Sequence, residues 1–157
     1  MLPDSEYIPA GSRADAHRHD MYELYSKARS WNDLSQSHLN LADLLMEEGL
    51  CKASLIVAHM AVKAKLKQVF LQSEGMLPPE DLGYDELIGR TREFAEIDLE
   101  TELFLTTLQY IAETENAAFL PRIESGHLEK MIARIKNVLS WLDVYAFSTA
   151  GAMRLDN

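Results

Sequence analysis

The residues best suited to chemistry lie on one side of a single predicted helix. Between residues 50 and 75 the chain has no proline and meets a glycine only at the end, so a helix of about six turns is expected. At about 100° per residue, one side of this helix gathers basic side chains within about 80° of one another. We call these residues the cationic ridge: Lys52, His59, Lys63 and Lys67. Lysines one turn apart can hold a phosphate as point charges, so the ridge predicts weak anion binding through Lys63, Lys67 and His59, with a solvated face as the alternative.

A second candidate site follows a proline. Arg122 and His127 stand five residues apart just after Pro121. An arginine that holds a phosphate and a histidine that moves protons are the minimum set for cleaving RNA through its 2′-hydroxyl. The two residues straddle the end of a loop and the start of a helix, and such pairs also arise by chance. The catalytic hypothesis for Arg122 and His127 therefore stays beside a structural one.

Nothing in the sequence predicts a metal site or a cofactor. Asp15 and His19 are four residues apart and could share a helix face, but a solvated face is the interpretation we favour. His38 lies on an apolar stripe, where a hydrogen-bonded interior histidine is expected. The glycine-rich phosphate loop, the CxxC pair, and the HExxH, GxSxG and di-iron ExxH motifs are all absent from the sequence.

Composition limits the class of protein further. The chain has 157 residues, of which 47% are hydrophobic and 25% charged, which is typical of one globular domain. Its net charge is −10, so binding of nucleic acid through overall charge is not expected. Cys51 is the single cysteine, the first residues do not form a signal peptide, and no segment reaches the roughly 20 apolar residues of a membrane span. We predict a soluble, cytoplasmic protein.

Hydrophobic periodicity predicts an all-α fold. We expect an up-and-down bundle of four long helices with one or two short extra helices. The domain organisation is an N-terminal arm with an extra helix over 1–30, a helical bundle over 31–147 and a frayed tail over 148–157. The expected helices are residues 14–29, 31–48, 50–75, 85–96, 98–118 and 124–147. On the second of them, the apolar stripe should consist of Leu34, His38, Leu41 and Leu45.

The order of these elements resembles the HEPN family of small helical domains. The family pattern has a tryptophan, a helix that ends at a glycine and a bulky residue, and then a small-residue helix with a lysine box. This chain offers Trp31, Gly49-Leu50 and the box from Ala58 to Lys67, followed by Pro78-Pro79. The resemblance covers about residues 31–147. It departs from the family at Lys63, where glutamate is usual, and near Tyr84, where a histidine is common.

The resemblance implies both partners and a possible activity. Family members form homodimers or pair with a minimal nucleotidyltransferase, and many are RNases with an Arg-x4-6-His motif at the end of the third long helix. Here Asn116 matches that motif, whereas Glu115 stands in place of the arginine and Leu120 in place of the histidine. Alternatively, residues 119–122 resemble a degenerate form of the family's Arg-Tyr-Pro-Asp box. Arg122 and His127 have the RNase spacing only if the site has moved past Pro121.

Three functions remain open at this point. The first is a non-catalytic or weakly catalytic HEPN-like homodimer that binds a nucleotide or a partner protein through Lys63, Lys67, His59 and Asn116. The second is a metal-independent RNase of the toxin-antitoxin type that uses Arg122 and His127. The third is a structural helical adaptor whose apolar faces serve only assembly. The central and last helices have more apolar perimeter than one small bundle needs, which favours a homodimer.

Overall fold

Five helices account for the regular structure in the part of the chain that the structure describes. The computed structural model describes residues 10–115 and 123–155, and the side chains of residues 20–115 and 123–145. In chain order the helices are α1 (Ala10–Glu47), α2 (Cys51–Glu74), α3 (Tyr84–Ala95), α4 (Leu99–Glu113) and α5 (Ser125–Leu155). No strand occurs in these two ranges, so the prediction of an all-α fold is confirmed. Within the described residues, no helix is long and apolar enough to cross a membrane.

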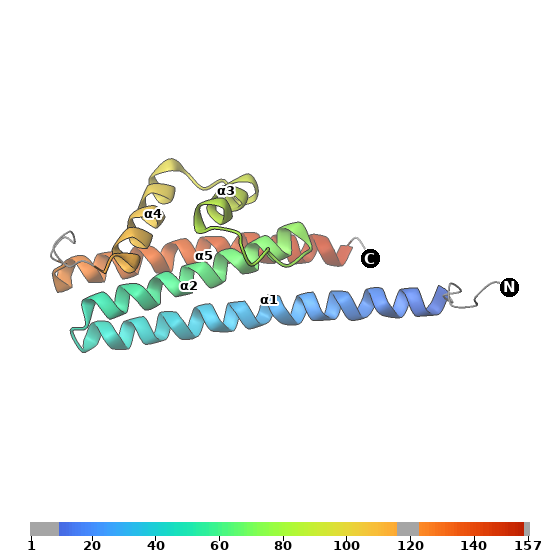
Figure 1. The fold of residues 1–157 in the computed structure, drawn as a ribbon, viewed down its shortest axis with the longest axis horizontal. Coiled ribbons are helices and arrows are strands. Elements are labelled where there is room, and N and C mark those ends of the chain that lie inside the picture. Colours follow the sequence, from blue (N-terminus) through green and yellow to red (C-terminus); the bar gives the residue numbers. More distant parts are fainter. Residues whose placement is uncertain (1–9, 116–122, 156–157) are drawn as a thin grey trace.

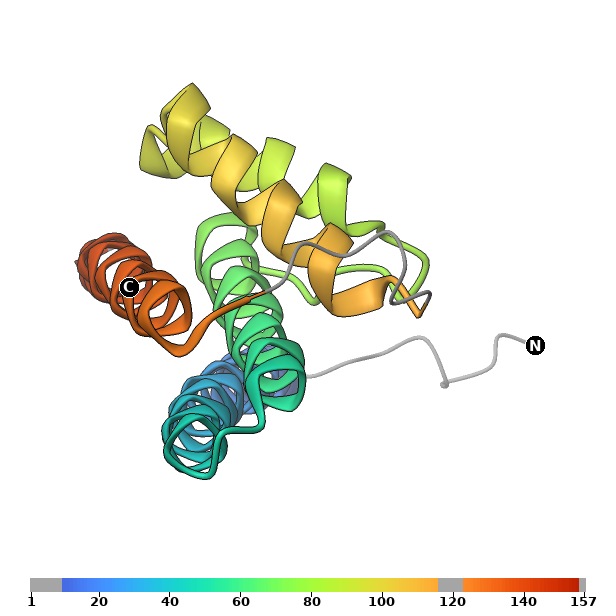
Figure 2. The ribbon, with the colours of Figure 1, turned by 90° about the vertical axis from the view of Figure 1, so that its left-hand side faces the viewer.

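The helices are arranged around α2. The three longest helices, α1, α2 and α5, run along a common direction, and α1 and α2 form an antiparallel hairpin (Figure 1). Figure 2 shows α2 with α1 on one side, α5 on another, and the shorter α3 and α4 on the side away from α1. All four other helices contact α2. Helix α2 is therefore central and packed on several sides.

Glycines mark both ends of α2, as the sequence predicts. Gly49, in the turn before the helix, has a φ of 78°, and Gly75, at the C-cap, has a φ of 71°. Both angles lie in the left-handed region that glycine adopts at little cost. The N–H of Gly75 donates to the carbonyl of Leu71 and closes the last turn. The predicted limits of this helix were therefore correct to within one residue.

The boundaries of three other helices differ from the prediction. The predicted helices over 14–29 and 31–48 are one continuous helix, α1, because the junction at Ser30-Trp31 contains no glycine or proline to break it. The predicted domain boundary at 30/31 thus falls inside α1. Helix α4 ends at Glu113, before the predicted residue 118. Helix α5 continues to Leu155, so the segment predicted as a frayed tail begins inside a helix.

The apolar stripe predicted for α1 was wrong. Among the side chains of α1 from residue 20 onwards, those that are buried are small or lie one step away from that stripe: Ala28, Ser35, Leu39 and Ala42. Ser35 Oγ donates to the carbonyl of Ala61 at 2.8 Å, and Ser54 Oγ donates to the carbonyl of Ala42 at 2.7 Å. Small side chains let the two backbones approach closely enough for these bonds. The larger Leu34 and Leu41 are left 45% exposed.

Candidate functional site

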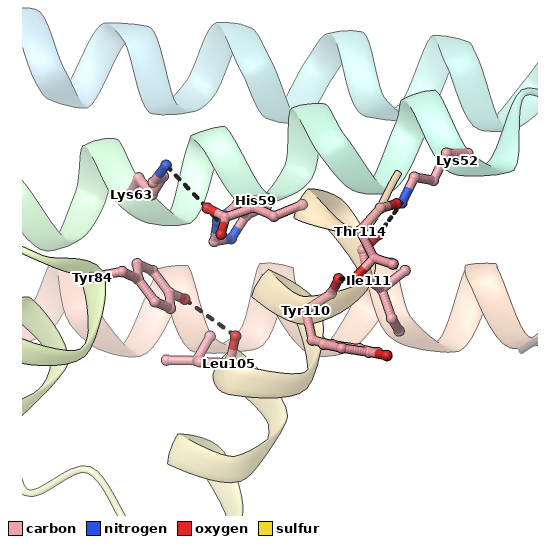
Figure 3. A network of polar contacts seen from close by, with 9 residues as sticks. Lys52, His59, Lys63, Tyr84, Leu105, Tyr110, Ile111 and Thr114 are labelled. Carbon is pink, nitrogen blue, oxygen red and sulfur yellow. Dashed lines mark hydrogen bonds and ion pairs between the residues drawn. The ribbon is translucent and has the colours of Figure 1, made fainter. Parts of the chain in front are cut away.

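The cationic ridge faces the ends of α3 and α4. Lys52, His59 and Lys63 follow one another along the side of α2 that looks towards these two helices (Figure 3). The residues that meet them come from positions 84 to 114, far away in the sequence. The structure therefore brings the ridge next to the end of α4, where the family resemblance puts its catalytic motif. The contacts of each ridge residue decide what this site can do.

Lys52 caps the C-terminal end of α4. Its ammonium donates to the carbonyl of Ile111, and also to the carbonyl of Thr114 at 3.1 Å (Figure 3). The last carbonyls of a helix have no partner inside the helix and carry a partial negative charge, which a lysine satisfies. Lys52 is thus engaged in holding α4 against α2.

His59 is a buried, neutral histidine. Its exposed fraction is 3%, and its ring packs edge-on against Tyr84 with 4.9 Å between the ring centroids. Burial, with a smaller contribution from the charge of Lys63, lowers the pKa of His59 to about 4, although the carboxylate of Glu113 opposes this. The distance from His59 Nε2 to Glu113 Oε1 is 3.7 Å, too long for a normal hydrogen bond. Within the described part of the chain, neither ring nitrogen has a hydrogen-bond partner.

Glu113 neutralises the middle of the ridge. Its Oε1 lies 3.7 Å from Lys63 Nζ as well as from His59. The side chains of Lys63 and Glu113 are 41% and 52% exposed, so water screens this pair. Lys67 is exposed, and no described residue forms an ion pair with it. Of the ridge residues, only Lys67 and part of Lys63 remain accessible to an anion.

Burial also affects the tyrosine at this junction. Tyr84 is 8% exposed, and its hydroxyl donates to the carbonyl of Leu105 at 3.4 Å. Burial raises the pKa of the Tyr84 phenol well above its usual value, and the negative charges of Asp85 and Glu113 act in the same direction. The phenol is therefore protonated at neutral pH. Together with a neutral His59, it offers no group that exchanges a proton near pH 7.

The remaining predicted site residues are not brought together in the described structure. Asn116, Leu120 and Arg122 lie outside the described residues, whereas Glu115 is described and exposed just after the end of α4. His127 is exposed in the first turn of α5. His38, predicted to be interior, is only partly buried on α1. Among the described side chains, no group of three or more His, Cys, Asp or Glu could hold a metal ion.

A buried lysine on α2 was missed by the sequence analysis. Lys65 is 2% exposed, and its ammonium donates to Asn32 Oδ1 at 2.6 Å, to Gln68 Oε1 at 2.7 Å, and to Asp143 Oδ1. It thereby joins α1, α2 and α5. Its position in the sequence could have indicated this burial. Lys65 lies on the same side of α2 as the buried Ser54 and Ala61, which come eleven and four residues earlier.

Comparison with known proteins adds no assignment. No family model matches the chain, and no curated protein matches it. At the junction of α2 and α4, most of the polar side chains described serve helix packing. Of the ridge residues, only Lys67 and part of Lys63 remain accessible as cations.

Proposed function

We propose that the chain is a non-catalytic, HEPN-like helical domain that works as a homodimer. The observation that carries this proposal is an apolar seam on the outside of the α1–α2 hairpin. We call it the outer face and define it as Leu34, Leu41, Val57 and Met60. Leu34, Leu41 and Met60 are each 45% exposed, and Val57 is partly buried.

The direction of the outer face follows from the contacts of neighbouring residues. Ser35 and Ala42 face α2, and Asp43, one residue after Ala42, faces α5 through its ion pair with Lys136 at 2.9 Å. Leu34 and Leu41 come one residue before Ser35 and Ala42, so they turn about 100° the other way. The same argument places Met60, one residue before Ala61, on that side. The outer face therefore points away from α5.

A two-helix layer with apolar residues on both sides needs cover on both sides. Helix α5 covers one side, and in the described structure no helix covers the outer face. Positions 34, 38, 41 and 45 alternate in steps of four and three and carry Leu, His, Leu and Leu, without a charged residue. This spacing is typical of a helix that packs along another helix. A second copy of the same face would supply a matching seam in a closed, two-fold arrangement.

The same geometry favours a non-catalytic domain. His59 and Tyr84 are buried and do not titrate near neutral pH, and Glu113 places a negative charge beside the ridge. Anion binding by Lys63 and Lys67 remains a proposal, with weak affinity because one of the two lysines is already paired. A nucleotidyltransferase partner and a cytoplasmic location also remain predictions. The RNase alternative requires RNA degradation without metal that is lost in His127→Ala.

The dimer is tested by the mass in solution. We expect sedimentation at micromolar concentration to give twice the chain mass of 17.8 kDa. Leu34→Glu combined with Leu41→Glu would bury four like charges in the interface and should give a monomer of unchanged helicity. Leu103→Glu on α4 is the matched control, because Leu103 is 58% exposed and lies outside the outer face; this variant should remain dimeric. A monomeric wild type, or a dimer that survives the double substitution, would refute the proposal.

A further inference from the structure

A groove lies between the start of α4 and the middle of α5. Its volume is about 380 Å³, within the roughly 300–1,000 Å³ of small-molecule sites. One wall is the turn between α3 and α4, with Glu96 and Asp98, and the other is α5, with Arg134, Asn137 and Trp141. These residues belong neither to the cationic ridge nor to the outer face. The groove is therefore a separate surface of the molecule.

Arg134 is held in the groove with most of its donors free. Its Cζ lies 4.4 Å from the centroid of the Phe104 ring, a contact that positions the guanidinium. Its one hydrogen bond within the described structure goes to Glu100 Oε1 at 3.4 Å, which is long, and the side chain of Glu100 is 82% exposed. A guanidinium has five N–H donors in a planar fork that matches a carboxylate. Arg134 is therefore available to bind a carboxylate in the groove.

The opposite wall is acidic. Glu96 is exposed, and its carboxylate forms no ion pair or hydrogen bond with any described residue. The carboxylate of Asp98 accepts from the N–H of Thr101, which is the main reason why the pKa of Asp98 is lowered; the charge of Arg134 lowers it further. Arg134 is thus close enough for its charge to act on Asp98 across the groove. The groove has a positive charge on one wall and two carboxylates on the other.

An apolar surface lies two turns along α5 from Arg134. Trp141 lines the groove, packs against the core, and is fixed by an edge-on contact with the ring of Tyr145, with 5.0 Å between the centroids. Positions 134, 137 and 141 share one face of α5. At 1.5 Å per residue, Arg134 and Trp141 are about 10 Å apart along the helix axis. A ligand that reaches both needs a charged end and an apolar end separated by a short spacer.

We propose that the groove between α4 and α5 binds the zwitterion of an amino acid with an aromatic side chain. The ligand carboxylate accepts from the guanidinium of Arg134 and the amide of Asn137, and the ligand ammonium donates to Glu96 and Asp98. The aromatic side chain packs on Trp141. A simple anion would meet the two carboxylates and a simple cation would meet Arg134, whereas a zwitterion matches both walls. This site needs neither the cationic ridge nor a dimer.

The probe is L-phenylalanine, titrated into the full chain by calorimetry and by amide NMR. We expect saturable binding, with shifts in the turn before α4 and in the middle of α5. Two analogues each lack one charge: 3-phenylpropanoate has no ammonium, and 2-phenylethylamine has no carboxylate. Each should bind about tenfold more weakly than phenylalanine or worse, because a charged group of the groove is left without its partner.

Variants of the two walls separate the two contacts. Arg134→Met and Glu96→Gln should each weaken phenylalanine binding by about tenfold or more. Glu96→Gln should not weaken the binding of 3-phenylpropanoate, which has no ammonium to lose. Lys130→Met is the matched control, because it removes the same charge one turn earlier on α5, where Lys130 is exposed and lies outside the groove. This variant should bind phenylalanine within about twofold of wild type.

Three results would overturn the assignment. One is the absence of saturable phenylalanine binding in the millimolar range. The second is equal binding of phenylalanine and 3-phenylpropanoate, which would show that the acidic wall recognises nothing. The third is unchanged phenylalanine binding in Glu96→Gln. Glu96 is exposed and glutamine has nearly its shape, so this variant is expected to fold, and it decides the question even if Arg134→Met does not fold.

Discussion

The buried histidine makes the stability of the fold depend on pH in a predictable way. His59 has an ordinary pKa of 6.5 in the unfolded chain and about 4 in the folded protein. Its folded pKa is the lower one, so protons bind the unfolded state more tightly. The contribution of the neutral ring to stability is fully present above pH 6.5 and is lost as the pH falls from 6.5 towards 4. Over the whole window the loss is about 3 kcal/mol, and between pH 7.5 and pH 5 it is about 2 kcal/mol.

The assay is urea unfolding at a fixed protein concentration, at steps between pH 7.5 and pH 5. Wild type should lose about 2 kcal/mol of unfolding free energy that His59→Gln does not lose, because glutamine carries no proton to bind in this range. His127→Gln is the control: its imidazole is exposed in the folded chain, so this variant should follow the wild type. Parallel profiles for wild type and His59→Gln would show that His59 is not buried as a neutral ring, and would refute the account of the α2–α4 junction.

Two further predictions concern the other lysines of α2. Lys52→Met should lower the free energy of unfolding by about 1–2 kcal/mol, because the carbonyls of Ile111 and Thr114 lose their donor. Amide hydrogen exchange should speed up first at the end of α4. A uniform change along the chain would contradict this role of Lys52. Lys65→Met should lower the free energy of unfolding by about 2–3 kcal/mol. This is less than the loss expected for a fully buried pair, because Asp143 is 41% exposed and regains water. Adding Asp143→Leu should recover part of that loss, and simple additivity in the double-mutant cycle would contradict a coupled pair.

The sequence was a reliable guide where a single helix determines its own features. The limits of α2 follow from the glycines at both ends, and Leu55, Ala58, Val62 and Leu66, which recur at the helical spacing of three or four residues, are all buried. Similarly, the helix expected from residue 98 begins at Leu99, and the side chain of Asp98 caps it by accepting from the N–H of Thr101 at 2.7 Å. These features depend on neighbours within about one or two turns, so periodicity and capping rules suffice.

The sequence was a poor guide to which side of α1 is buried. The stripe of Leu34, His38, Leu41 and Leu45 is the more hydrophobic one and was expected to face the core. The structure buries Ala28, Ser35 and Ala42 instead, because close contact with α2 requires small side chains and provides hydrogen bonds across the hairpin. Periodicity identifies an apolar stripe but does not identify the surface that it meets. In the homodimer that we propose, both sides of α1 would be covered.

The basic residues of α2 show the same limit for the candidate site. The role of each residue depends on groups supplied from 30 to 80 positions away. The carbonyls at the end of α4 take up Lys52, Glu113 pairs with Lys63, and Asp143 reaches Lys65. Most of the positive charge of α2 therefore holds neighbouring helices in place, in a chain whose net charge is −10. Because Glu113 already pairs with Lys63, binding is better sought on a surface that the helices leave uncovered, the outer face.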